Sequence, residues 1–522
     1  MWRIKSLDAI LATAEKKSLH RSLGPFQLTM LGIGAVIGTG IFVLTATAAQ
    51  KAGPGMMISF IIAGAVCAVA ALCYSELASM VPVAGSAYTY SYAVMGELVA
   101  WLVGWALILE YALGASAVAV GWSGHIVGVL GDMGIHLPHA LTVGPKISWG
   151  FLTGGEVGGI INLPAVIITV LVTLLLVLGT KESAVVNTVL VAIKIAALTL
   201  FLVLTLPLVT GHLANFQPFT PRGWGNLMGG SGTGVLGAAA SIFFAYVGFD
   251  AVSTAAEETK NPQRNVPIGL LASLFICTVF YLLVASGVIG SWGAQPLADP
   301  STGQFFADGS PELYGSAACG SAHAPTVCSK EALAYILHQV NNPIAGYLVG
   351  LAATFALPSV VLMMMYGQTR IFFVMARDGL LPGALSAVHR SFKTPWIITI
   401  ITGVVVALAA AFFPVGQLAD YSNAGTLFAF AAVSLGVMIL RFADPKRTRP
   451  FRTPAVFIVA PLSILGCAVL FISLTKQAMG LFAVWAVIGL IFYFSYGFWK
   501  SNVRRGVEFD EPLTEGPGGI PD

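Results

Sequence analysis

The chain alternates long apolar stretches with short segments that carry most of its charged residues. A helix that crosses a bilayer needs about 20 mostly apolar residues, and each of these stretches is near that length. Twelve such stretches lie near residues 27–50, 56–81, 93–121, 160–179, 184–210, 233–256, 266–290, 344–376, 395–414, 421–442, 455–475 and 478–499. The pattern predicts an all-α polytopic membrane protein with twelve transmembrane helices.

The composition also indicates that lipid is the main solvent, since 57% of the 522 residues are hydrophobic and only 9% are charged. An ordinary soluble domain carries about 25% charged residues, and a soluble chain of this composition would expose large apolar patches. The formal net charge of +3 gives no indication of nucleic-acid binding. We therefore expect the lipid bilayer as a partner and no nucleic acid.

Positive charges are unevenly distributed when the segments between the stretches are assigned alternately to the two sides. With the N-terminus inside, twenty of the 26 Lys and Arg residues fall in cytoplasmic segments and five in outer segments. Cytoplasmic loops of membrane proteins carry such an excess, so we expect both termini in the cytoplasm. The expected divisions are a cytoplasmic N-terminal segment, a core of ten helices, two additional helices and a cytoplasmic tail, at residues 1–26, 27–442, 443–499 and 500–522.

Motifs of catalytic or metal sites are not found along the chain. The eight His residues show no HxxxH spacing, and no GxSxG, CxxC or GxxxxGK segment is present. These are the patterns that zinc, acyl-transfer, redox and phosphate-binding sites need. We therefore expect a protein that is not an enzyme and that has no metal site and no cofactor.

The cysteines divide into two groups. Two of the six, Cys319 and Cys328, lie in one predicted outer loop with eight residues between them, whereas the other four lie in predicted spans. Because the outside is oxidising, we expect a disulfide between these two. Two free thiols are the alternative.

The first apolar stretch contains sequence that a continuous helix would avoid. Gly32, Gly34, Gly38 and Gly40 fall within nine positions, and each Gly costs about 1 kcal/mol relative to Ala in a helix interior. A face of small residues that packs against another helix would explain Gly34 and Gly38, but not Gly40. A break near Thr39 would leave free amide groups, which can hold a carboxylate.

The sixth stretch carries a carboxylate, Asp250, in the segment SIFFAYVGFD. An ionisable residue inside a span indicates a functional site, although Asp250 could instead cap a second half-helix. Either role implies a break in this span. Spans 1 and 6 are five helices apart, so breaks in both predict two inverted five-helix repeats with a substrate site between them at the midplane.

The residues around these breaks resemble a known family. The similar segments are GIGAVIGTGIFV, YSELASMVPVAGSAYTYSY, LVAIKI, FFAYVGFDAVSTAAEETKNPQRNVP and MYGQTRIFFVMARDGLLP, and the resemblance covers roughly residues 20–500. The sequence is similar to the amino acid–polyamine–organocation superfamily, and within it to bacterial members of the cationic amino acid transporter family. The resemblance implies a twelve-helix fold with a 5+5 inverted repeat and broken helices 1 and 6.

The resemblance also implies the substrate-binding residues. Backbone groups of Gly38, Thr39 and Gly40 would hold the substrate carboxylate, and the Phe244 ring would close over the substrate. The carbonyls expected to take the substrate ammonium are those of Val36, Phe244, Ala245 and Val247. Lys194 occupies the position at which sodium-coupled relatives bind an ion and proton-coupled ones carry a lysine.

Two further ionisable residues lie within spans. Lys194 is surrounded by apolar residues, and such a lysine costs about 2.5–3.5 kcal/mol at the bilayer centre on insertion scales. Unlike arginine it can lose its proton, which favours a role in proton coupling over a purely structural ammonium. Glu110, in span 3, is either a side-chain or proton site or a structural partner.

The function expected from the resemblance is import of L-amino acids by proton symport with alternating access, in the inner membrane of a bacterium. The partners would be an amino acid and protons. The sequence leaves open whether a small accessory membrane subunit also binds. An amino acid exchanger is one alternative. An amino acid sensor or scaffold that binds without transport is another, and the sequence does not distinguish cationic from small neutral substrates.

Overall fold

The computed structural model describes residues 23–505, except 82–85, 150–151, 156–157, 180–183, 226–231, 255–258, 309, 322 and 393. Most of the predicted N-terminal segment and the tail after Arg505 therefore lie outside the described residues. Apart from one short hairpin, β1 (Ile147–Trp149) with β2 (Leu152–Gly154), the regular structure of the described residues is helical.

All twelve predicted stretches form helices, which confirms the twelve-helix architecture. Eight of the spans that are single helices are α5 (Met56–Met80), α7 (Glu97–Asp132), α8 (Leu163–Leu178), α9 (Ala184–Val209), α12 (Pro262–Trp292), α15 (Pro343–Arg377), α16 (Trp396–Phe412) and α18 (Val456–Ile472). The tenth span is α17 (Val415–Ala443), and the twelfth is α19 (Lys476–Phe492). The first and sixth spans are broken into shorter pieces, which are described below.

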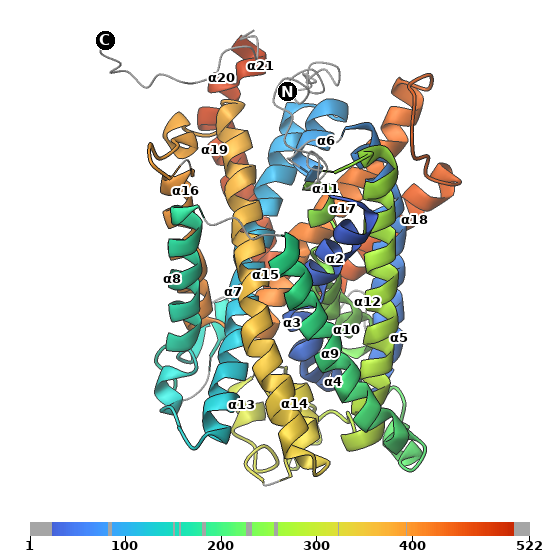
Figure 1. The fold of residues 1–522 in the computed structure, drawn as a ribbon, viewed down its shortest axis with the longest axis vertical. Coiled ribbons are helices and arrows are strands. Elements are labelled where there is room, and N and C mark those ends of the chain that lie inside the picture. The colour runs from blue at the N-terminus through green and yellow to red at the C-terminus, as the bar shows by residue number, and fades with distance from the viewer. Residues whose placement is uncertain are drawn as a thin grey trace.

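The two ends of the bundle carry different small elements (Figure 1). At one end lie α6 (Ser86–Val94), α20 (Phe498–Lys500) and α21 (Asn502–Arg505), and at the other lie α13 (Pro311–Tyr314) and α14 (Ala332–Gln339). The first end is the one predicted to face the cytoplasm, and the second is the predicted outer end.

Packing places spans 3, 8 and 10 at the centre of the molecule. α7 packs against both α15 and α17, while α8 and α16 lie side by side at one edge and α5 and α18 at the opposite edge (Figure 1). Large apolar side chains of the outer helices, such as Leu174, Val404 and Ile458, are more than half exposed. Such an apolar perimeter is stable in hydrocarbon but would aggregate in water.

The twelfth span is attached to the third by stacked indoles. Trp105 and Trp485 lie with their ring centroids 4.5 Å apart. Each ring nitrogen donates to the backbone carbonyl of the other residue, at 2.8 Å in both directions. This reciprocal pair gives both polar N–H groups an acceptor, which lipid does not provide.

At the end predicted to face the cytoplasm, a buried carboxylate joins span 2 to span 10. Glu76 is fully buried and accepts hydrogen bonds from Arg441 at 2.9 and 2.6 Å and from Arg449 at 3.1 Å. Arg449 also donates to the carbonyls of Leu440 and Asp444 at the end of α17. A bidentate pair of this kind fixes geometry as well as charge, so these positive residues hold the helix ends together in addition to marking the predicted cytoplasmic side.

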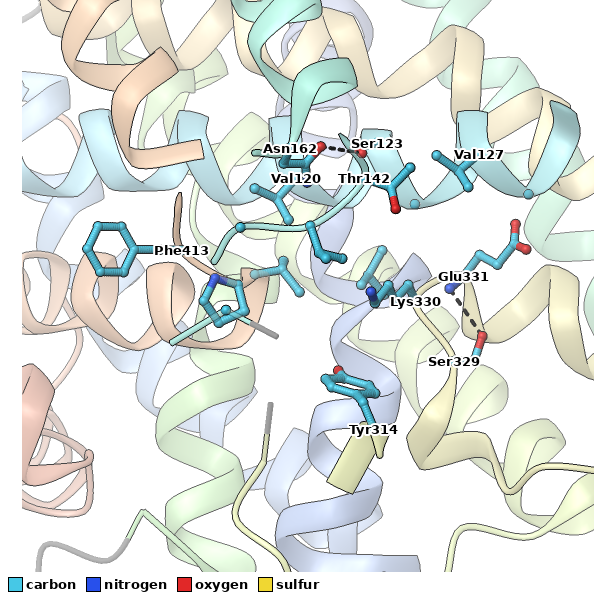
Figure 2. Close-up of a pocket in the computed structure, with 18 of the residues that line it drawn as sticks. Val120, Ser123, Val127, Thr142, Asn162, Tyr314, Ser329, Lys330, Glu331 and Phe413 are labelled. Carbon is cyan, nitrogen blue, oxygen red and sulfur yellow. Dashed lines mark hydrogen bonds between the residues drawn. The ribbon is translucent and has the colours of Figure 1, made fainter. Parts of the chain in front are cut away.

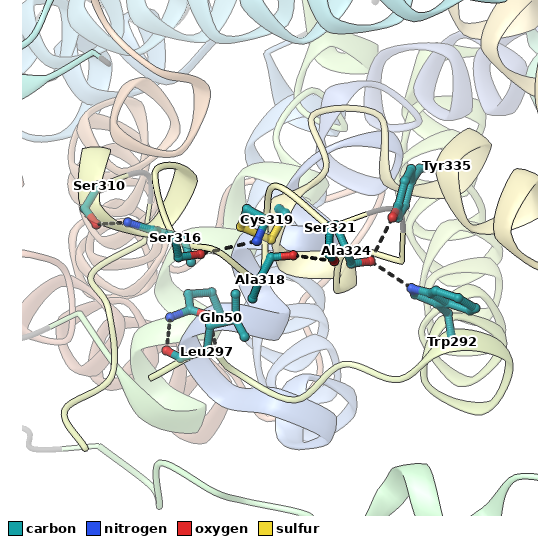
Figure 3. Close-up of a disulfide and its surroundings, with 12 residues drawn as sticks. Gln50, Trp292, Leu297, Ser310, Ser316, Ala318, Cys319, Ser321, Ala324 and Tyr335 are labelled. Atoms are coloured by element: carbon teal, nitrogen blue, oxygen red, sulfur yellow. Dashed lines mark hydrogen bonds between the residues drawn. A yellow bond between two sulfur atoms is a disulfide. The ribbon is translucent and has the colours of Figure 1, made fainter. Parts of the chain in front are cut away.

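Cys319 and Cys328 are joined in the structure, with their Cα atoms 5.4 Å apart (Figure 3). The loop they close is held to its neighbours through Ala324, whose carbonyl accepts from the Tyr335 hydroxyl at 2.8 Å and from the Trp292 ring nitrogen at 3.1 Å. The loop therefore lies against the outer ends of α12 and α14.

Alkylation of the purified protein without reductant should leave Cys319 and Cys328 unmodified, because both sulfur atoms are bonded and the outside is oxidising. After reduction, mass spectrometry should find both alkylated. The four other cysteines are buried and free, and in the unfolded protein they should be alkylated under either condition, which makes them an internal control. Alkylation of both loop cysteines before reduction would contradict the disulfide.

Candidate functional site

The first span breaks where the glycines predicted it. α2 (Pro25–Val36) ends before Ile37 and Gly38, both of which are extended, and the helix resumes as α3 (Thr39–Phe42). A second interruption at Val43, which the sequence did not predict, separates α3 from α4 (Leu44–Ala52). The first span is therefore three helical pieces, and the break exposes the backbone groups of the middle piece.

The sixth span breaks at the same level. α10 (Gly234–Ile242) passes into the single turn η4 (Phe243–Tyr246), and the chain is irregular from Val247 to Asp250 before α11 (Ala251–Thr254). The two breaks pack directly on each other, since a Cβ atom on Gly40 would lie only 2.3 Å from the Cα atom of Ala245. Only glycine at position 40 allows this approach.

Carbonyls at both breaks accept hydrogen bonds from side chains of other spans. The Lys194 ammonium of α9 donates to the Gly34 carbonyl at 2.7 Å. The Tyr281 hydroxyl of α12 lies 2.9 Å from the carbonyl oxygen of Val36 and 2.7 Å from that of Ala245. Helix ends leave their last carbonyls without intrahelical partners, and these two side chains supply the missing donors.

The predicted carboxylate cup contains a buried hydroxyl. Thr39 is fully buried between the two breaks and α7, where Gly121 packs against its side chain, and its Oγ1 has no hydrogen-bond partner among the described residues. A buried polar atom without a partner costs about 1–3 kcal/mol. Thr39 and the neighbouring backbone can therefore gain energy from a polar ligand at this position.

Glu110 and Asp250 are both buried near the sixth-span break. Asp250 accepts a hydrogen bond from the Tyr111 hydroxyl at 3.1 Å, so its side chain joins the break to α7. Neither carboxylate oxygen of Glu110 has a hydrogen-bond partner among the residues that the structure describes. Buried carboxylates in a membrane span are costly and mark functional sites by default.

Comparison with known proteins decides the family. The amino acid permease family matches residues 23–493, nearly all of the chain. This chain belongs to the amino acid permease family. The family lies within the amino acid–polyamine–organocation superfamily, as the sequence motifs indicated, and it points to a transporter rather than an enzyme.

Three relatives show how far the similarity extends. The branched-chain amino acid permease BcaP of Bacillus subtilis (strain 168) is 44% identical over 506 residues, or 97% of this chain and 99% of that protein. The methylthioribose transporter of the same organism is 40% identical, over 95% of this chain and 97% of that protein. The vacuolar cationic amino acid transporter 4 of Arabidopsis thaliana is 35% identical, over 85% of this chain and 67% of that protein.

In this permease the structure brings together most of the predicted site residues. Gly38, Thr39 and Gly40 lie at the first break, and Phe244, Ala245 and Val247 at the second, with Lys194 bonded to the carbonyl of Gly34. Tyr281 was not predicted, because a tyrosine in the apolar stretch ICTVFYLL looks like an ordinary packing residue. Only its contact with both breaks distinguishes it.

Replacing Tyr281 by Phe should weaken substrate binding about tenfold. The change removes only the hydroxyl that lies between the two breaks, and a lost hydrogen bond to a buried carbonyl costs about 1–3 kcal/mol. Substrate affinity measured by calorimetry on purified permease checks this. Tyr246→Phe is the matched control, since the Tyr246 hydroxyl donates to the Phe60 carbonyl at 3.0 Å, away from the first break. Equal affinities in both variants would contradict a role for the Tyr281 hydroxyl.

A cavity of about 320 Å³ lies on the predicted outer side of the first break (Figure 2). Val43, at the second interruption of span 1, lines it together with Val120 and Ser123 of α7 and Glu331 of the outer loop. Burial, and to a lesser degree the Asp132 carboxylate, raises the pKa of Glu331 to about 8. Gly121, which packs against Thr39, and Val120, which lines the cavity, are neighbours on α7.

Proposed function

We propose that this permease imports L-amino acids across the bacterial plasma membrane by proton symport, with both termini in the cytoplasm. The observation that supports proton coupling is the buried Lys194 ammonium, which donates to a carbonyl freed at the first break. A titratable group in contact with the element that binds substrate can link proton binding to substrate binding.

The proposed substrate site lies between the two breaks. The backbone at Gly38, Thr39 and Gly40 would hold the carboxylate, and the unpartnered Thr39 hydroxyl would add a donor. Carbonyls of Val36, Phe244, Ala245 and Val247 would take the ammonium. The carbonyls of Val36 and Ala245 share the single hydroxyl hydrogen of Tyr281, but a carbonyl has two lone pairs, so the ammonium can use another. The Phe244 ring would cover the substrate.

Protonated Lys194 would hold α2 at Gly34 and so keep the cup assembled. When the lysine loses its proton, its nitrogen keeps fewer hydrogens and no charge, and the tie to Gly34 weakens. The inner part of span 1 would then move away and open the site to the cytoplasm. A proton can shift this equilibrium only by binding more tightly to one state, and the charge-assisted bond to Gly34 provides that difference.

Glu110 and Asp250 are proposed as secondary residues. Asp250 is tied to α7 through Tyr111, and Glu110 is available to a proton or to a polar substrate side chain. We also propose that the transport core comprises residues 27–442 and that residues 443–499 are two added helices. The packing of α18 mainly on α17 and α5 supports this division.

Uptake into proteoliposomes tests the function. A pH gradient, acidic outside, should drive accumulation of labelled amino acid without sodium in a symporter. Uptake that requires amino acid on the opposite side would instead indicate an exchanger, and binding without uptake would indicate a sensor.

The names of the relatives indicate which substrates should be tested first. Because two relatives named branched-chain amino acid permease match at least 95% of the chain, we propose leucine, isoleucine and valine as the first substrates. Competition by lysine, arginine and methylthioribose should be weak, because the first two add a charge and the last has neither a carboxylate nor an ammonium. Strong competition by one of these three would reassign the substrate class.

A further inference from the structure

A buried ion pair joins three spans on the predicted outer side of the substrate site. Lys51, near the end of α4, counts in the sequence as an outer-loop cation, but it is only 4% exposed. Its ammonium lies 2.9 Å from a carboxylate oxygen of Asp420 in α17, which is 3% exposed. The Ser241 hydroxyl of α10 accepts from Lys51 and donates to the other carboxylate oxygen of Asp420. Spans 1, 6 and 10 therefore meet in one polar cluster.

A second tie between spans 6 and 10 lies one turn further along α17. Asn423 is fully buried, and its side-chain nitrogen donates to the carbonyls of Ala240 and Ser241 at 2.8 Å each. Shortly after these two residues, Phe243 and Phe244 begin the turn η4 at the break in span 6. The polar cluster and Asn423 therefore hold α10 against α17 beside the proposed substrate site.

The outer halves of spans 1 and 6 form one unit with part of the outer loop. α4 and α10 pack against each other (Figure 1). The Gln50 side chain of α4 donates to the carbonyls of Leu297 and Phe306 at 3.0 and 2.9 Å and accepts from the Leu297 amide at 2.8 Å. Arg222, in the loop before α10, donates to the Gln50 carbonyl at 2.8 Å. A movement of this unit away from α17 has to break the ion pair.

The two charges respond differently to a closed and an open arrangement. While the unit lies on α17, Lys51 and Asp420 compensate each other, and when the unit moves away, water can solvate both. Removal of one charge leaves the other buried without its partner in the closed arrangement alone, which is strongly unfavourable. Loss of either charge should therefore shift the equilibrium toward the open arrangement.

We propose that Lys51, Ser241 and Asp420 form the latch of an outer gate, which holds the outer halves of spans 1 and 6 against span 10. The latch has to break before an amino acid can enter from the outside, and it has to form again before the carrier opens inward. The proposal rests on the proposed function, because such a gate serves only a carrier that exposes its site to the two sides in turn. The three residues position helices and do not bind the substrate.

A cysteine at Val360 can report whether this gate is open. Val360 of α15 lies against Gly38 at the first break and is only 2% exposed. An impermeant maleimide added outside intact cells can therefore reach it only through an open outer entrance. Its labelling rate is divided by that of a cysteine at Met133, which is 60% exposed at the predicted outer end of α7. The native chain without an added cysteine gives the background, and the measurement needs no substrate.

Lys51→Met should raise this labelling ratio about tenfold or more, because Asp420 is then buried without its cation in the closed arrangement. Asp420→Asn should also raise the ratio. Ser241→Ala keeps both charges and loses only the bridging hydroxyl, so it should raise the ratio by a smaller factor. Exchange of the pair, Lys51→Asp with Asp420→Lys, should return the ratio to near the native value, which a purely local packing role of either residue would not produce.

Glu312→Gln is the matched control, because Glu312 forms an ion pair with Lys146 at 3.4 Å on the same side, but about half of each side chain is exposed. Exposed pairs contribute little, so the labelling ratio should stay native. The melting temperature of each variant separates gate opening from unfolding. A native ratio in folded Lys51→Met, or in Ser241→Ala where Lys51→Met does not fold, would overturn the proposal. An exchanged pair that labels as fast as the single variants would do the same.

Failure of this proposal is distinguishable from failure of the proposed function. If a pH gradient drives no accumulation in the native chain but Lys51→Met still raises the labelling ratio, proton symport is wrong and the latch stands. If the native chain accumulates amino acid under a pH gradient but the ratio does not respond to Lys51→Met, the latch is wrong and the proposed function stands.

Discussion

Lys194→Met is expected to abolish the accumulation of amino acid that a pH gradient drives. Methionine fills a similar volume but cannot donate to the Gly34 carbonyl, which accepts from Lys194 at 2.7 Å, and it cannot carry a proton. A substrate gradient of tenfold corresponds to about 1.4 kcal/mol, and without a titratable group the proton gradient supplies none of it. Uptake into proteoliposomes with an acidic outside should fall to the level of equilibration, even where substrate binding remains.

Two further variants sharpen this result. Lys194→Arg should not restore accumulation, because the guanidinium does not lose its proton, although it can still donate to Gly34. Lys446→Met, at an exposed position near the predicted cytoplasmic surface, should transport normally. Sodium should have no effect, since the ammonium takes the place of the ion. Concentrative uptake by Lys194→Met, or a sodium requirement in the native chain, would contradict proton coupling through this residue.

Gly38→Val should weaken substrate binding about 100-fold or more. The branched side chain would stand where the substrate carboxylate must approach the backbone, and hydrogen bonds to a charged group contribute about 1.5–3 kcal/mol each. The protein itself has room for a Cβ at this position, since its nearest contact would be Val360 at 3.5 Å. Calorimetric titration of purified variant with the native substrate measures the loss directly.

Gly40→Val is a less informative variant than Gly38→Val. A Cβ at position 40 would meet the Ala245 backbone at 2.3 Å, so its loss of binding would also follow from separation of the two breaks. Gly38→Ala avoids this problem and should give an intermediate loss of affinity with an unchanged melting temperature. Native affinity in a stable Gly38→Val permease would exclude this backbone as the carboxylate site.

Much of the architecture could be predicted from local sequence. The length of each apolar stretch is fixed by bilayer thickness, so twelve spans are readable without tertiary contacts. The break in span 1 follows from Gly38 and Gly40, and that in span 6 from Asp250 after a run of aromatic residues. Lys194 stands out because an ammonium among apolar neighbours needs a partner, and in the structure the Gly34 carbonyl at the span-1 break is such a partner.

The partners of other polar residues could not be predicted in this way. Tyr281 contacts carbonyls 245 and 36 positions away in the chain, and Lys51 pairs with Asp420, 369 positions away. Such contacts depend on which distant helix faces pack together, and nothing in the local pattern distinguishes Tyr281 from a packing tyrosine. The interruption at Val43 is not marked by a glycine or a proline in the sequence.

The sequence by itself therefore determined that lipid is the main solvent, how many spans there are and where two of them break. It also singled out Lys194, whose ammonium needs a partner within the membrane. These depend on transfer free energies and backbone preferences, which act within one stretch of chain. The tertiary structure alone decided which donors satisfy the freed carbonyls and that Lys51 is buried rather than solvated. Those outcomes depend on packing between distant segments, where a buried polar group must find a partner.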